Sequence, residues 1–456
     1  MAQAYQVPQS GWRSISAKQR RTVAGGAIGT LMEYFDYYLY GLASATVFPA
    51  VFFPAANPVV GTLSSFASFA FGFLLRPIGG LVFGHIGDRM GRKTTLMITV
   101  IGMGISTAAI GLIPSASTIG IAAPILLLFF RMLQGLFVGG EMGGAAALVV
   151  EHAPAGKRGL YGALLISGAG IANVASAGLM AAFGAGPKSF FMEWGWRVPF
   201  LLALVLAIVA IVLRSKLEES EEFKELSANR ESAGAKRKSP LREVFRHPKN
   251  AILGILIGLP QSIAGYIVLT FGLAYMVSKG TQAQVGFIGT MIVGVLQIFV
   301  APMWGSLSDR IGRRKVYIGA CIAFALLVYP TFALFSTQTA ILIWLGMVIG
   351  FVIPGVAMQG TLQTMLVEMF DVEARTTGVN IGYQISNTIG GGFAPLIATA
   401  LSAAFGSVWP VIIYVAVIAL IGVVATAYAS FRPDTEDAGR LHDTAAEATA
   451  TETSSH

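Results

Sequence analysis

Four charged side chains lie well inside long apolar segments of this sequence, away from the ends of those segments. They are Glu33, Asp36, Arg76 and Arg131. A charged group at the centre of a bilayer costs about 2.5–3.5 kcal/mol on insertion scales, so such a residue usually serves a function. Burial disfavours the charged form of a carboxyl group, so a carboxylate in such a place can take up a proton. An arginine stays charged and can attract an anion or hold a carboxylate.

The two carboxylates share one face of a predicted helix with tyrosines. Glu33 and Asp36 are three residues apart, and Tyr37 and Tyr40 continue the same face at helical spacing. We therefore predict that Glu33 or Asp36 carries a proton that moves together with a substrate. The alternative is a structural ion pair between one of these carboxylates and an arginine.

Arg131 is the residue predicted to bind an anionic substrate, because a guanidinium can hold a carboxylate through two parallel hydrogen bonds. Two alternatives are open. Arg131 could pair with an acid of the first apolar segment for structure alone, or it could tune the proton site there. Arg76 precedes Pro77, which should kink its helix. The sequence leaves open whether Arg76 faces a cavity or packs near a gate.

The second half of the chain has neutral polar groups where the first half has charges. They are Gln261, Tyr266, Gln359, Gln363, Asn380, Tyr383, Gln384 and Asn387. The last four form an i, i+3, i+4, i+7 stripe, which could line a watery cavity or join neighbouring helices by hydrogen bonds. All except Asn380 are predicted to contact the substrate, together with Arg131, Tyr37 and Tyr40.

A short charged pattern occurs twice, about half the chain apart. One copy begins at Gly84 and the other at Gly305, and both read G-x-x-x-D-R-x-G-R-[KR]. The simpler interpretation is a solvated turn with cations on the inner side of a membrane. The alternative is a charged latch in each half of a duplicated membrane protein. The residues predicted to form such a gate are Arg76, Gly84, Asp88, Arg89, Gly91, Arg92, Glu141, Asp309, Arg310, Gly312 and Arg313.

Membrane-spanning helices must position all of these residues. The chain has 456 residues, of which 55% are hydrophobic and only 12% charged, whereas soluble domains average about 25% charged residues. A spanning helix needs about 20 mostly apolar residues. We predict an all-α integral membrane protein with twelve transmembrane helices in two pseudo-symmetric six-helix bundles. The predicted helices are 22–46, 61–83, 94–114, 120–144, 159–183, 197–214, 251–277, 284–305, 316–335, 340–367, 376–402 and 409–430.

Glycines recur at four-residue spacing in several of these segments. The pairs are Gly135 and Gly139, Gly140 and Gly144, and Gly378 and Gly382. Small residues let helix backbones approach one another in a membrane. We therefore predict closely packed helices that can still slide.

The positions of lysine and arginine predict the orientation. Almost all of them lie in the amino-terminal arm, the middle loop and the loops after even-numbered helices, which places both termini in the cytoplasm. The predicted divisions are an arm at 1–21, a bundle at 22–214, a middle loop at 215–250, a second bundle at 251–430 and a disordered tail at 431–456. Within the middle loop, residues 217–226 form either an amphipathic surface helix or a charged linker.

Other classes of function find little support in the sequence. The formal net charge is +8, but the cations sit in short loops and form no basic stripe, so we expect no nucleic-acid partner. The single cysteine, Cys321, cannot form an intramolecular disulfide. We expect no metal and no cofactor. The absence of a Walker loop, a zinc motif and a nucleophile elbow argues against a membrane enzyme.

The repeated pattern resembles the cytoplasmic loop signature of the major facilitator superfamily, and Arg131-x3-Gly135-x3-Gly139 resembles a second signature of that superfamily. Four segments resemble its metabolite–proton symporters, which include shikimate, citrate, 2-oxoglutarate and proline/betaine carriers. These segments are Glu33–Tyr37, Phe73–Gly80, Gly139–Glu141 and Trp194–Phe200.

The resemblance covers nearly the whole chain apart from its tails. It implies a multi-pass transporter of the cell inner membrane that works by alternating access and uses no cofactor. The expected activity is import of a small organic anion with protons, such as a shikimate-like acid or a di- or tricarboxylic acid. The alternative substrate is a zwitterionic osmolyte such as proline or betaine. The expected partners are the small molecule, protons and membrane lipid, and the expected state is a monomer.

Overall fold

The computed structural model describes residues 17–54, 57–90, 92–140, 149–150, 153, 156–215, 248–370 and 375–431. Within these ranges, side chains are described except at 17–28, 84, 87–89, 92–93, 213–215 and 375–376. The predicted helix at 217–226 and most of the predicted tail lie outside the described residues.

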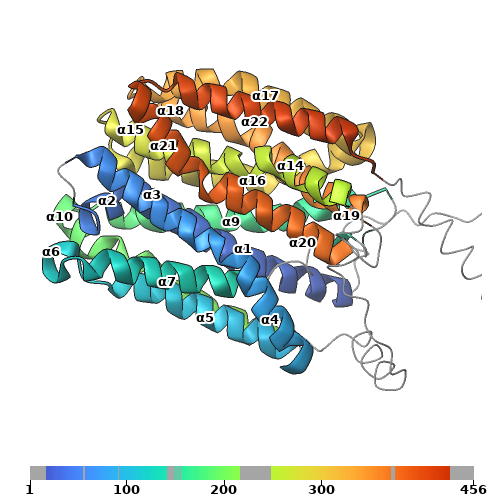
Figure 1. The fold of residues 1–456 in the computed structure, drawn as a ribbon, viewed down its shortest axis with the longest axis horizontal. Helices are drawn as coiled ribbons and strands as arrows, with labels where there is room; N and C mark the ends of the chain where they lie inside the picture. The colour runs from blue at the N-terminus through green and yellow to red at the C-terminus, as the bar shows by residue number, and fades with distance from the viewer. Residues whose placement is uncertain are drawn as a thin grey trace, which may run out of the picture.

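The first half of the chain forms a bundle of helices that run roughly side by side (Figure 1). Its elements are α1 (Ala17–Thr46), α2 (Phe48–Val51), α3 (Pro58–Leu74), α4 (Arg76–Met90), α5 (Arg92–Leu112), α6 (Ala116–Ile119), α7 (Ala122–Gly139), α9 (Arg158–Gly184), α10 (Lys188–Phe190), the π-helical turn η2 (Phe191–Gly195) and α11 (Arg197–Ser215).

The second half forms a similar bundle beside the first. Its elements are α14 (Pro248–Gly265), η3 (Tyr266–Phe271), α15 (Gly272–Ser278), α16 (Ala283–Ile311), α17 (Arg313–Phe335), α18 (Ala340–Met347), η4 (Val348–Val352), α19 (Pro354–Met369), α20 (Arg375–Ser386), η5 (Asn387–Gly392), α21 (Ala394–Phe405) and α22 (Trp409–Tyr428). We call the end of the molecule that holds residues 305–315 the motif end and the opposite end the far end. The motif end lies at the right of Figure 1.

Eleven helices in the described part of the chain are long and apolar enough to cross a membrane. The helix α1 is the twelfth; it has 30 residues, but Glu33, Asp36 and its tyrosines make it more polar than the others. The predicted fold class, with twelve helices in two six-helix bundles, is confirmed. The predicted helix 120–144 corresponds to α7, and residues 141–148 lie outside the described ranges.

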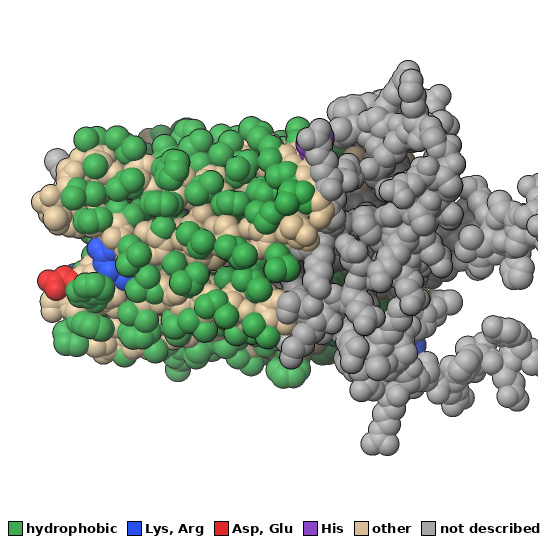
Figure 2. Space-filling model, turned by 90° about the horizontal axis from the view of Figure 1, so that it is seen from below, with side chains coloured by type: hydrophobic (Ala, Val, Ile, Leu, Met, Phe, Trp, Pro, Cys, Tyr) green, Lys and Arg blue, Asp and Glu red, His purple; other side chains and the backbone are tan. Residues whose placement is uncertain are grey.

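The surface between the two ends is apolar. Figure 2 shows hydrophobic side chains over most of one face, with charged side chains only towards its two ends. Large hydrophobic residues are widely exposed on the outer helices, among them Ile125, Leu326 and Val205. The four ionisable residues of the apolar segments are instead buried. This distribution suits a protein whose sides contact hydrocarbon and whose charges face inward.

Within the described residues, four spanning segments contain π-helical turns that were not predicted from the sequence. In η4, the Ile353 N–H donates to the Val348 carbonyl five residues back, at 3.3 Å. Pro354 follows, and a proline has no N–H and its ring crowds the carbonyl four residues earlier, so a wider turn relieves the conflict. The turns η3 and η5 begin at Tyr266 and Asn387, two of the predicted substrate residues.

Close backbone contacts hold α7 against α3 and α4. A Cβ atom on Gly135 would overlap the carbonyl oxygen of Gly72, and one on Gly139 would overlap that of Arg76. The predicted close packing at these two glycines is therefore confirmed. The contact matters for the polar residues nearby, because it sets the distance between the helices that carry Arg76 and Arg131.

We expect Gly135→Val to destabilise the protein by more than about 3 kcal/mol, since the overlapping atom belongs to backbone that cannot rotate away. Gly319→Val is the matched control, because nothing lies within 4 Å of a Cβ at that helical position. The measurement is the melting temperature of both purified variants in detergent. Equal melting temperatures would show that the α7–α3 contact is not tight.

Candidate functional site

The helix α1 carries two buried polar clusters at the centre of the molecule. Glu33 and Asp36 are only 3% and 2% exposed. Each carboxylate faces one of the two predicted arginines, Glu33 towards Arg76 and Asp36 towards Arg131. The two acids therefore belong to separate pairs, although they lie on neighbouring positions of one helix.

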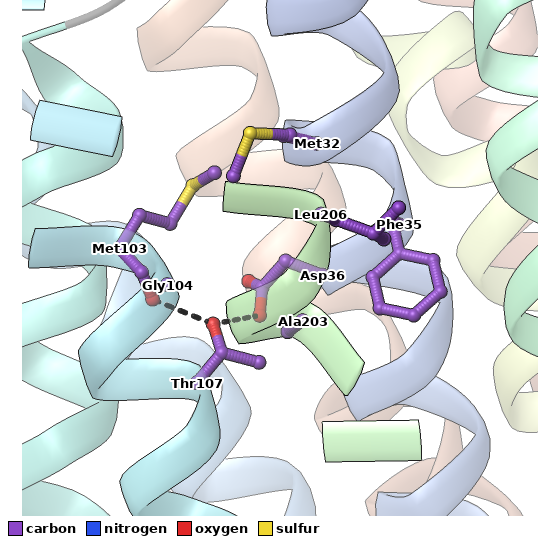
Figure 3. Close-up of a pocket in the computed structure, with 8 residues that line it drawn as sticks. All are labelled: Met32, Phe35, Asp36, Met103, Gly104, Thr107, Ala203 and Leu206. Carbon is purple, nitrogen blue, oxygen red and sulfur yellow. Dashed lines mark hydrogen bonds between the residues drawn. The ribbon is translucent and has the colours of Figure 1, made fainter. Parts of the chain in front are cut away.

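The Asp36 cluster lies wholly within the first half. Arg131 Nη1 of α7 donates to Asp36 Oδ2 at 2.9 Å and to Gln134 Oε1 at 2.6 Å. The Gln134 side-chain amide in turn donates to Asp36 Oδ1 and, at 2.7 Å, to Thr107 of α5. Thr107 also donates to the carboxylate at 3.4 Å and to the Met103 carbonyl, as Figure 3 shows. Three helices therefore meet at this one carboxylate.

Sequence reasoning missed Gln134 and Thr107. Gln134 lies three residues after Arg131, so helical spacing could have placed the two side chains on one face. Thr107 had no such signal, because only the packing of α5 against α7 and α11 brings it to Asp36. A small pocket lies next to the Asp36 carboxylate. Asp36 and Thr107 line it, and the rest of its lining is apolar (Figure 3).

The Glu33 cluster joins α1 to the start of α4. The Tyr37 hydroxyl donates to Glu33 Oε1 and accepts a hydrogen bond from Arg76 Nη1, which lies 3.8 Å from Glu33 Oε1. The Arg76 guanidinium lies 4.1 Å from the ring centre of Tyr37 and 3.7 Å from that of Phe73. The helix breaks before Pro77, since α3 ends at Leu74 and α4 begins at Arg76. This break directs Arg76 towards α1.

A small central pocket lies between the two halves. Its lining residues are Tyr34, Tyr37, Tyr38, Gln261, Ser262, Gly265, Tyr266, Thr270, Gln359 and Asn387. Five of the predicted substrate residues are among them, namely Tyr37, Gln261, Tyr266, Gln359 and Asn387. The lining comes from α1 on one side and from α14, η3, α19 and η5 on the other. It contains hydroxyl, amide and aromatic groups and no charged side chain.

The other predicted substrate residues do not line this pocket. Arg131 lies beneath aromatic rings, with its guanidinium 4.1 Å from the ring centre of Tyr40 and 4.9 Å from that of Phe69. Phe69 also contacts the pocket residue Tyr266, so its ring lies between Arg131 and the pocket wall. Tyr40 forms a hydrogen bond with Ser68 at 2.8 Å.

The second-half residues outside the pocket differ in their contacts. Tyr383 shares a 2.8 Å hydrogen bond with Tyr34, which joins α20 of the second half to α1 of the first. Gln363 and Gln384 are buried, and neither polar atom of the Gln384 side chain has a hydrogen-bond partner. A buried amide without a partner is a site where a water molecule or a ligand can bind.

The second copy of the repeated motif joins the two halves at the motif end. Asp309 of α16 accepts hydrogen bonds from the backbone N–H groups of Gly159 and Leu160, at 2.8 and 2.9 Å, in the first turn of α9. Carboxylates are favoured there because free N–H groups and the helix dipole both attract negative charge. Arg313 lies 3.2 Å from Asp309 and 3.0 Å from Glu368 of α19. We call Asp309, Arg313, Glu368 and the first turn of α9 the latch.

Within the latch, sequence reasoning missed Glu368. The motif glycine Gly312 has a φ of 95°, a backbone conformation that favours glycine after a helix end. The first copy cannot be compared, since its predicted gate residues Gly84, Asp88, Arg89, Gly91 and Arg92 lie outside the positions whose side chains are described. Glu141, a further predicted gate residue, lies outside the described residues. Among the described residues, no group of three or more His, Cys, Asp or Glu side chains could hold a metal ion.

Comparisons with known proteins agree with this architecture. A family model described as "Sugar (and other) transporter" matches residues 23–433. The shikimate transporter of Escherichia coli (strain K12) is 39% identical over 407 residues, which cover 88% of this chain and 92% of that protein. The proline/betaine transporter of Salmonella typhimurium (strain LT2) is 36% identical over 418 residues, covering 89% and 82%. The crystal structure of a D-xylose–proton symporter matches with a TM-score of 0.68 at 18% identity, over 90% of this chain and 96% of that one.

Proposed function

Because the chain belongs to the sugar (and other) transporter family of the major facilitator superfamily, we propose that it imports a small organic anion together with protons. It is a multi-pass membrane transporter and not an enzyme. The proposed substrate is a carboxylate such as a shikimate-like acid or a di- or tricarboxylic acid. The similarity to a shikimate transporter supports this choice of substrate class.

The observation that carries the proposal is the position of the central pocket. Both halves line it, and a buried carboxylate and a buried arginine lie directly behind one of its walls at Tyr37. A site shared by two halves can open to either side when the halves tilt, which is the basis of alternating access. A carboxylate beside that site can carry the proton that accompanies an anion. Arg131 is proposed to hold Asp36 in place, and its direct contact with substrate is the alternative.

We place the protein in the bacterial inner membrane as a monomer, with the motif end, both termini and the middle loop in the cytoplasm. The cations of the loops at that end support this orientation. The apolar sides of the molecule suit contact with lipid, and no nucleic-acid partner is proposed. The latch would then be a cytoplasmic contact that holds the inward gate closed.

One observation favours the alternative substrate, a zwitterionic osmolyte such as proline or betaine. Four tyrosines line the central pocket, and it has no charged lining residue. Aromatic faces can attract a quaternary ammonium group, as in sites that bind choline. The similarity to proline/betaine transporters points in the same direction.

The test is uptake by the purified full-length chain in proteoliposomes with an imposed proton gradient, acidic outside. Labelled shikimate, citrate, proline and glycine betaine are compared, each with and without an uncoupler. We expect uncoupler-sensitive accumulation of at least one carboxylate above its outside concentration. Accumulation of proline or glycine betaine alone would select the zwitterion hypothesis. Accumulation that an uncoupler leaves unchanged would refute proton coupling.

A further inference from the structure

Two carboxylates compete for the role of proton carrier, and their surroundings differ in one respect. Asp36 receives hydrogen bonds from Arg131, Gln134 and Thr107, all in the first half, and none of these three donors lines the central pocket. Glu33 instead shares the Tyr37 hydroxyl with Arg76, and Tyr37 does line the pocket. Only the second arrangement gives a ligand in the pocket direct access to a group that holds the carboxylate.

We propose that Tyr37 couples substrate binding to protonation of Glu33, with Arg76 as the positive charge that the substrate senses. The proposal rests on the proposed function, since it assumes an anionic substrate in the central pocket. In the substrate-free protein, the Tyr37 hydroxyl donates to Glu33. When a substrate carboxylate enters, it accepts that hydrogen bond in place of Glu33, and Glu33 takes up one proton from water. One anion and one proton therefore bind together.

Electrostatic repulsion makes substrate binding and protonation of Glu33 depend on each other. Two carboxylates that share one hydroxyl repel each other strongly in a buried site, so only one of them can stay charged. The Arg76 guanidinium compensates a single negative charge, which belongs to Glu33 before binding and to the substrate afterwards. Arg76 has capacity for a further contact, because its Nε atom is buried without a hydrogen-bond partner.

The other groups around Glu33 do not offer the same connection. Among the described side chains, the charged or titratable groups that face it are Arg76, the tyrosines Tyr34, Tyr37, Tyr266 and Tyr383, and Asp36 on the next turn of α1. Tyr34 bonds to Tyr383 across the two halves. Tyr266 lines the pocket from η3 and packs on Phe69 and Phe73. Tyr37 is the one that bonds to both Glu33 and Arg76.

The test measures how substrate affinity depends on pH. If one proton binds with each anion, the Kd of the wild type should rise by about tenfold per pH unit above the range where Glu33 is protonated. We expect Tyr37→Phe to lose most of this dependence, because the hydroxyl that links the two sites is gone. Tyr34→Phe is the matched control: it changes the same pocket on the same helix, and it should keep the wild-type slope even if its affinity falls.

The probe is labelled shikimate, with equilibrium binding to the purified full-length chain over a series of pH values. If Tyr37→Phe does not fold, Glu33→Gln provides a second test. This variant should bind shikimate at every pH with the affinity that the wild type shows at low pH. A wild-type slope in Tyr37→Phe or in Glu33→Gln would overturn the proposal, as would a slope lost only in Asp36→Asn. Failure of the wild type to bind or transport any carboxylate would instead refute the proposed function.

Discussion

Replacement of Arg131 by alanine is expected to reduce transport by at least about a hundredfold, because it leaves Asp36 buried without its cation. Removal of one partner from a buried ion pair costs about 3–5 kcal/mol, and every 1.4 kcal/mol corresponds to about tenfold in an equilibrium. Asp36 is 2% exposed and Arg131 1% exposed, so bulk solvent does not reach this pair. The amount of folded protein after detergent extraction and the initial uptake rate measure the loss.

A double substitution separates the effect of Arg131 on folding from its effect on transport. Arg131→Met combined with Asp36→Asn removes both charges and keeps similar volumes, and such replacements of buried pairs are often neutral for stability. We expect this double variant to recover the wild-type amount of folded protein. If Glu33 carries the proton, the pH dependence of substrate binding should return with it. Recovery of the fold without the pH dependence would assign the proton to Asp36.

Arg131→Lys distinguishes the two roles of this arginine. Lysine keeps the charge but loses the planar arrangement of donors. If Arg131 only holds Asp36, substrate affinity at saturating protonation should stay unchanged; a shifted pH optimum in addition would make Asp36 part of the proton site. If Arg131 contacts the substrate carboxylate, affinity should fall at every pH. We expect the first result, because the Tyr40 and Phe69 rings cover the guanidinium and Arg131 does not line the central pocket.

Asp309→Ala is expected to have the second largest effect, since it breaks the latch. The carboxylate accepts two backbone hydrogen bonds and pairs with Arg313, and a hydrogen bond to a charged group contributes about 1.5–3 kcal/mol. Loss of the backbone hydrogen bonds and of the Arg313 ion pair would shift the equilibrium between the closed and open gate at the motif end. We expect a shift of about tenfold or more towards the open gate. Uptake should fall because the protein spends less time with that gate closed.

The shift can be measured with a reporter cysteine. Ser262→Cys places a thiol in the central pocket. The native Cys321 is fully buried, so we expect it not to react with the reagent. We expect Asp309→Ala to speed reaction of this thiol with a membrane-impermeant reagent added at the motif end. Lys315→Gln is the control, because it removes an exposed charge from the same motif. Equal labelling rates in both variants would contradict the latch.

Much of the fold could be predicted from the sequence, because the length of an apolar segment is a local property. The face shared by Glu33 and Tyr37 also followed from helical spacing alone. The partners of these residues did not. Arg131 was the expected substrate contact, yet packing of α7 against α3 and α5 turns it towards Asp36 and covers it with rings. Tyr34, Tyr38, Ser262 and Thr270 line the pocket without any sequence signal, since their positions depend on how the halves meet.

The π-helical turns give the two halves different mechanical properties. In the described parts of the chain, η3, η4 and η5 interrupt spanning helices of the second half, whereas η2 of the first half lies near the far end. Each holds one residue more than an α-helical turn. If a turn returned to α-helical spacing, the remainder of its helix would rotate by about 100° and shift by about 1.5 Å along its axis. Tyr266 and Asn387 would then swing away from the central pocket. We therefore expect the second half to flex during transport against the first half, whose helices meet at Asp36.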